Sequence, residues 1–198
     1  MSKFLNHFIS KWYKYLFALI LAIVLWILLI DLFVAPKKNE KIGIFIGSYG
    51  MSEKINEAIT KPDYLREINF YDVNINESYY FILFSSYASS GDFDMAIVAE
   101  SQFRESDIQY YEKINQEKFE GSFGVFDYYR VNDDIYGVKV YDSETNQGIL
   151  TDYIAFEDEG FEEDYYLFFS NSSIHLGPLN DSQYDGLYEI LKELLNKE

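Results

Sequence analysis

One uninterrupted apolar segment near the N-terminus constrains this chain more than any other feature. The segment Tyr15 to Val34 reads YLFALILAIVLWILLIDLFV, and Asp31 is its only charged residue. Twenty residues match the length of a helix that spans a bilayer. A cleaved signal peptide is the alternative, with a shorter apolar core of about 7–15 residues followed by small residues. Pro36 directly after Ala35 makes a poor cleavage site, so we favour an uncleaved signal anchor.

The positive charges that flank this segment are nearly equal on its two sides and do not decide its orientation. Three lysines lie on each side, namely Lys3, Lys11 and Lys14 before it and Lys37, Lys38 and Lys41 after it. Positive charges mark the cytoplasmic side of a span, and here they are equal in number. The short N-terminal tail favours an N-terminus inside the cell. We therefore expect a single-pass cell-membrane protein with a cytoplasmic tail (1–14), a signal anchor (15–34), a tether (35–41) and an extracytoplasmic domain (42–198).

The charge of the chain is concentrated in the expected domain. Residues 1–41 carry six lysines and two acids, a net charge of +4, whereas residues 42–198 carry ten basic and thirty-one acidic residues, a net charge of −21. The two values sum to the −17 of the whole chain. Such a domain repels phosphate backbones and anionic membrane surfaces, which excludes nucleic acid as a partner. Solubility alone explains the charge, and a cation, a cationic solute or a basic protein would also suit it.

The first half of the domain predicts alternating strands and helices. Strands are expected at 41–47, 68–73 and 93–99, with helices at 53–60 and 77–89 between them. The third strand, FDMAIVA, is almost continuously apolar, as is typical of a strand buried on both faces. Strands joined by short helical crossovers build a parallel sheet.

The second half of the domain changes pattern. One or two short helices are expected within 101–119, followed by strands at 121–129, 135–141, 150–156 and 165–170. A closing helix at 183–196 carries an apolar stripe formed by Tyr184, Leu187, Ile190, Leu191 and Leu194. The predicted fold class is therefore α/β, with a parallel start and antiparallel returning strands.

The domain has no cysteine, which excludes a lipoprotein anchor and disulfide bonds.

This order of elements resembles one lobe of a type II extracytoplasmic solute-binding protein, the receptor component of bacterial importers. The resemblance is carried by the strands KIGIFIG, INFYDV and FDMAIVAES and by the ending YYLFFSNSSIHLGPLNDSQYDGLYEILKELLNKE. Members of that family carry a second lobe between the middle strand and the returning strand, and only residues 143–164 are available for one here. Because the family traps its solute by closure of two lobes, the resemblance implies the fold more than it implies transport.

Ligands of open α/β sheets bind beyond the carboxyl ends of the parallel strands. The residues expected there are Gly47, Ser48, Tyr49, Asn74, Glu100 and Ser101. The stretch IGSYG, residues 46–50, could hold an acceptor group on its backbone amides, or it could be a plain turn from strand to helix. We favour the turn, because the stretch matches no phosphate loop or nucleophile elbow.

Residue types that perform catalysis or bind metals are scarce. His175 is the only histidine of the domain, and without cysteine it forms neither a zinc set nor a Cys–His dyad, so a turn or packing role is expected. The stretch 142–148, DSETNQG, lacks the glycine and the final carboxylate of a calcium loop and predicts a solvated hairpin turn. The acidic run 157–164 predicts a solvated loop. We expect no catalytic residue, metal or cofactor.

The sequence thus predicts a membrane-anchored extracytoplasmic binding protein without catalytic activity, whose partner is a small solute or a cation. The alternative is an interaction module of the cell envelope that docks to a transporter subunit or another membrane protein. A concave cluster at the strand ends would favour the first interpretation, and a flat, exposed apolar patch larger than a few hundred Å² would favour the second.

Overall fold

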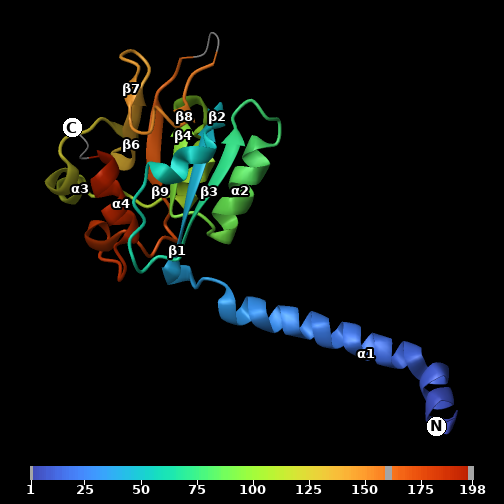
Figure 1. Cartoon of the computed structure of the whole chain (residues 1–198). Helices are drawn as coiled ribbons and strands as arrows, with labels where there is room; N and C mark the ends of the chain where they lie inside the picture. The colour runs from blue at the N-terminus through green and yellow to red at the C-terminus, as the bar shows by residue number, and fades with distance from the viewer. Residues whose placement is uncertain (1, 159–161, 196–198) are drawn as a thin grey trace. The chain divides into compact units, whose positions relative to one another are not determined.

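The computed structural model describes residues 2–158 and 162–195, with side chains for residues 11–30, 35–158 and 162–195 (Figure 1). The chain divides into two compact units, residues 1–37 and 38–198. The first unit contains the helix α1 (Ser2–Val34). Within it, Lys11–Ile30 is long and apolar enough to cross a membrane, a property that signal sequences share.

A mixed β-sheet forms the centre of the second unit. Its strand order is β3-β1-β4-β9-β6-β5, and β7 pairs with β6 beside this path. The strands are β1 (Lys41–Ser48), β3 (Glu67–Asn74), β4 (Met95–Ala99), β9 (Tyr165–Phe169), β6 (Asp134–Asp142), β5 (Tyr128–Val131) and β7 (Gln147–Gly148). Strands β3, β1 and β4 are parallel, and β9, β6 and β5 each run antiparallel to the preceding neighbour. The predicted mixed α/β class is confirmed.

The helices of the second unit are short. Among its described residues, three are α-helices, namely α2 (Tyr80–Ser90), α3 (Gln116–Phe123) and α4 (Gly186–Leu195). The 3-10 helices are η1 (Lys38–Glu40), η2 (Glu53–Glu57), η3 (Glu100–Gln102), η4 (Glu105–Tyr110) and η5 (Gly177–Leu179). Gly91 caps the end of α2 with a φ of 66°, a left-handed conformation that glycine adopts without steric cost.

Helices α2 and α4 lie on opposite faces of the sheet. The ring of Phe45 in β1 packs against Tyr80 and Phe84 of α2. The side chain of Ile42 points to the other face, where its Cδ1 lies close to Gly186 at the start of α4. Successive side chains of a strand alternate between faces, so odd-numbered residues of β1 face α2 and even-numbered residues face α4. All five residues of β4 and of β9 are buried, which places the core along the middle of the sheet.

The closing helix begins later than predicted, at Gly186, so that Tyr184 lies before it, and its predicted last residue, 196, lies outside the described residues. Three further predicted elements differ from the structure. The helix expected at 53–60 is only the 3-10 helix η2, which Ser52 caps by accepting a hydrogen bond from the Lys54 amide. The strand expected at 121–129 is wrong in its first part, because α3 continues to Phe123 and β5 starts at Tyr128. The strand expected at 150–156 shrinks to β8 (Ile154–Ala155), which pairs outside the main sheet with β2 (Gly50–Met51).

His175 and the stretch 142–148 take the structural roles expected of them. His175 is completely buried, and its Nε2 lies 3.1 Å from the Lys38 carbonyl oxygen. In the stretch 142–148, the Asp142 carboxylate accepts hydrogen bonds from the Thr145 amide and hydroxyl at 2.9 and 3.0 Å, which closes the turn between β6 and β7.

Candidate functional site

The structure brings the ends of β1 and β3 together, because Ser48 pairs with Asn74 in the parallel ladder. The Asn74 side-chain amide donates to the Tyr49 carbonyl oxygen at 2.9 Å, and its Oδ1 accepts from the Asn76 amide. Ser48 is completely buried, and its hydroxyl donates to the Gly50 carbonyl oxygen at 3.1 Å. The polar groups of the predicted site are therefore committed to the turn itself.

Gly47 is required by packing. An ideal Cβ at this position would lie 2.4 Å from the hydroxyl oxygen and 2.8 Å from a ring carbon of Tyr80. Tyr80 is the first residue of α2, and its ring fills the space beside the end of β1. The stretch 46–50 is therefore a turn whose glycine admits a neighbouring ring, in agreement with the favoured interpretation.

Glu100 and Ser101 follow the end of β4, and the chain itself binds their amides. The Glu100 amide donates to the Asp164 carbonyl oxygen at 2.9 Å. The Ser101 amide donates to the Glu163 carboxylate at 3.0 Å. A carboxylate of this protein thus occupies the position in which an anionic ligand would accept a hydrogen bond.

We name residues 153–158 and 162–164 the strap, because this segment covers the strand ends. The Tyr49 amide donates to the Ala155 carbonyl oxygen at 3.0 Å, and the Ser52 amide donates to the Tyr153 carbonyl oxygen at 2.7 Å. Together with the bonds to Glu100 and Ser101, these contacts join the strap to the turns after β1 and β4. The predicted solvated loop, 157–164, is therefore attached through Glu163 and Asp164 to the residues that follow β4, and its residues 159–161 lie outside the described part of the chain.

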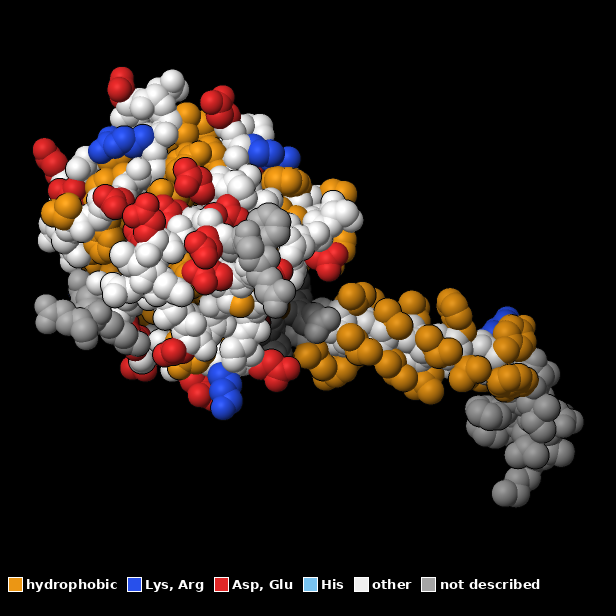
Figure 2. All heavy atoms as spheres, turned by 90° about the horizontal axis from the view of Figure 1, so that it is seen from above, with side chains coloured by type: hydrophobic (Ala, Val, Ile, Leu, Met, Phe, Trp, Pro, Cys, Tyr) orange, Lys and Arg blue, Asp and Glu red, His pale blue; other side chains and the backbone are white. Residues whose placement is uncertain are grey.

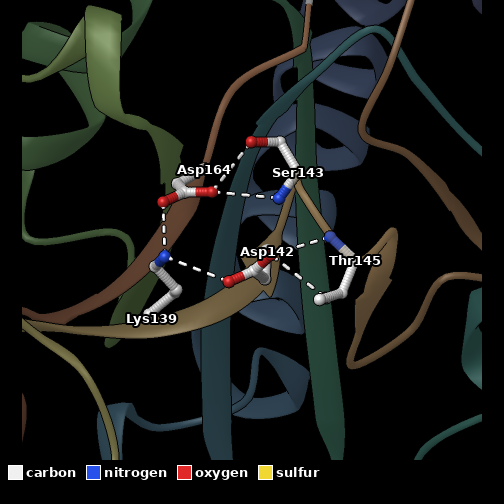
Figure 3. A network of polar contacts seen from close by, with 5 residues as sticks. All are labelled: Lys139, Asp142, Ser143, Thr145 and Asp164. Carbon is white, nitrogen blue, oxygen red and sulfur yellow. Dashed lines mark hydrogen bonds and ion pairs between the residues drawn. The ribbon is translucent and has the colours of Figure 1, made fainter.

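A polar network fixes the end of the strap (Figure 3). The Asp164 carboxylate pairs with the Lys139 ammonium group at 2.5 Å and accepts hydrogen bonds from the Ser143 amide and hydroxyl at 2.9 and 3.0 Å. Lys139 also pairs with Asp142 at 3.3 Å. Burial opposes the ionisation of Asp164, but the hydrogen bonds from Lys139 and Ser143 outweigh it and lower the pKa of the Asp164 carboxyl.

Two tyrosine hydroxyls near the strand ends have no hydrogen-bond partner. Tyr80 is 2% exposed and Tyr165 is 0% exposed, and both hydroxyl oxygens are buried without a partner. Burial raises the pKa of both phenols well above their ordinary value. An unsatisfied buried hydroxyl costs about 1–3 kcal/mol, so these two groups require an explanation.

The surface at this end of the domain is acidic. Figure 2 shows the end of the domain toward which the parallel strands of Figure 1 point, and Asp and Glu side chains gather on it. Within the strap, Glu157 and Glu163 are half-buried, and Asp158 and Glu162 are exposed. Among the described residues, no group of three or more His, Cys, Asp or Glu side chains is arranged to hold a metal ion.

Sequence reasoning missed Lys139, Asp164, Tyr80 and Tyr165. One signal for the first was present, because Lys139 is the only charged residue in the otherwise apolar strand IYGVKVY, residues 135–141. A charge in a buried strand requires a partner of opposite charge. No sequence pattern indicates that this partner is Asp164, twenty-five positions further along the chain.

No protein-family model matches the chain, and comparisons with curated proteins and with solved structures gave no significant match.

Proposed function

We propose that this protein is a membrane-anchored, non-catalytic interaction module of the cell envelope. In this proposal α1 is an uncleaved anchor, and the acidic α/β domain lies outside the cytoplasm. The domain binds another envelope protein, such as a subunit of a transporter.

The observation that carries this proposal is the covered state of the strand ends. The amides of Tyr49, Glu100 and Ser101, which would meet a solute in an open α/β sheet, donate to atoms of the strap. The sheet itself, with a parallel start and antiparallel returning strands, is compatible with descent from one lobe of a solute-binding protein. In that view the strap replaces the second lobe, and an ancestral ligand site is now filled by the chain.

Site-specific photo-crosslinking in the cells that make this protein tests the proposal. A photoreactive amino acid is placed at one of three exposed positions on different elements of the domain: Asp72 on β3, Asp152 before β8 or Glu189 on α4. A docked partner gives one discrete protein adduct from one of these positions and none from the others. Equal, indiscriminate adducts from all three positions, or none from any, would contradict an interaction module.

A second candidate function is solute binding beneath a strap that opens. The unpartnered hydroxyls of Tyr80 and Tyr165 favour it, because a bound polar solute would satisfy them. A thermal-shift screen of the full chain against sugars, amino acids, peptides, polyamines and divalent cations tests this candidate. Saturable stabilisation that disappears in Tyr80→Phe would support it, since ligand binding raises the melting temperature by mass action.

A further inference from the structure

The two edges of the sheet are built differently. At one edge, β5 has only four residues and its register with β6 shifts between Tyr129 and Arg130. At the other edge, β3 pairs with β1 over all eight of its residues without a shift. Short strands, bulges, prolines and lysines protect an edge from pairing with another chain. Strand β3, EINFYDVN, carries no bulge, proline or lysine, and its two charged residues, Glu67 and Asp72, are both acidic, so they disfavour an acidic partner strand but not a basic one.

The backbone groups on this outer side follow from the ladder. The Ile75 amide donates to the Ser48 carbonyl oxygen, so odd-numbered residues of β3 bond to β1. Bonding direction alternates along a parallel strand, and the amides of Phe70 and Asp72 therefore point away from β1. Within the described residues, β3 pairs with no strand other than β1.

A pocket of about 200 Å³ lies beside this edge, on the face of β3 opposite α2. Its lining consists of Ile68 and Phe70 of β3 together with Asn56, Ile59 and Lys61. In strand addition, main-chain hydrogen bonds supply affinity and pockets for alternate side chains supply specificity. The edge and the pocket are therefore the two parts that such a site needs.

We propose that β3 is the docking edge of this interaction module and that its occupant is an extended, basic segment of another protein. One apolar side chain of that segment enters the pocket next to Phe70. A basic side chain two positions away lies beside the carboxylate of Asp72, which is exposed. The net charge of −21 on residues 42–198 favours a basic partner and opposes pairing with a second copy of this chain.

This inference rests on the proposed function and is tested on the full chain in lipid nanodiscs. A display library of random ten-residue peptides is selected for binding to the wild-type protein. Enriched peptides are expected to alternate apolar and basic residues. Asp72→Pro, which removes one outward amide at an edge where proline is tolerated, should weaken their binding at least about tenfold. The matched control Asp72→Asn keeps the amide and should weaken binding less.

A second measurement does not depend on the folding of the proline variant. Amide hydrogen exchange at Phe70 and Asp72 should slow when the enriched peptide saturates the wild-type protein. The same peptide with N-methyl groups on alternate amides keeps its charge and should lose both binding and protection.

Several results would overturn the strand-addition proposal. They are a library without enrichment, peptides that bind Asp72→Pro as tightly as wild type, and protection confined to other elements. Protection of Phe70 and Asp72 that grows with protein concentration in the absence of peptide would assign the edge to a second copy instead. If these peptides fail while a discrete photo-adduct forms from Asp152 or Glu189, the interaction module stands and only the β3 edge is refuted.

Discussion

Replacing Asp164 by asparagine tests the attachment of the strap. The Asp164 side chain is 18% exposed and its partner Lys139 is 19% exposed, so solvent screens this pair only in part. Breaking a buried ion pair costs about 3–5 kcal/mol, whereas an exposed pair contributes about 0–1 kcal/mol. Asparagine can still accept from Ser143, but it loses the charge that Lys139 requires. We therefore expect a loss of about 2 kcal/mol in the free energy of unfolding, between these limits.

The assay is thermal unfolding of the full chain in detergent, followed by the near-ultraviolet circular dichroism of tyrosine. Both tryptophans, Trp12 and Trp26, lie in α1, so tyrosine signals report mainly on the α/β domain. At this domain size, 2 kcal/mol corresponds to a fall of about 4–8 °C in the melting temperature. The control is Asp181→Asn, because Asp181 pairs with Lys118 but its side chain is 82% exposed. Equal melting temperatures for the two variants would refute the structural role of the Asp164 network.

Three further predictions concern pH and packing. The lowered pKa of Asp164 adds stability above the carboxyl pKa of the unfolded chain, about 3.9, and this stability is lost as the pH falls through the lower folded pKa. The urea midpoint should therefore fall in acid less steeply for Asp164→Asn than for wild type, and parallel curves would contradict this. Tyr165→Phe removes a buried hydroxyl without a partner and should raise stability in urea by about 1 kcal/mol, whereas a loss would reveal a partner of that hydroxyl. Gly47→Ala crowds Tyr80 and should cost about 1–3 kcal/mol in the same titration, but Gly50→Ala, where the added Cβ has no atom within 4 Å, should cost clearly less.

The sequence predicted the centre of the sheet because the signal there is local. Strand β4 lies within the almost continuously apolar run FDMAIVA, which is the pattern of a strand that is buried on both faces. The end of α3 was misread as the beginning of a strand, because Phe119 and Phe123 were not recognised as a helical pair four residues apart. Their ring centroids lie 4.8 Å apart, both rings are buried, and the Asn115 side chain caps the helix.

The predicted order of strands and helices was enough to place the candidate site residues at the strand ends. It gave no indication that the strap would cover these residues. The strap joins Tyr49 to Ala155, more than a hundred positions along the chain, through a pair of two-residue strands. Such short strands carry no periodicity that a sequence can reveal. The contacts also use backbone groups, which every residue type except proline supplies.

Amide hydrogen exchange on the ligand-free full chain in nanodiscs tests the central claim most directly. That claim is that the strand ends are closed by the strap while the edge of β3 is open. The amides of Tyr49 and Glu100 should exchange slowly, at rates set by opening of the domain, and those of Phe70 and Asp72 should exchange rapidly. Rapid exchange at Tyr49 and Glu100 together with protection at Phe70 and Asp72 would contradict the account. It would show an open strand-end site and an occupied edge.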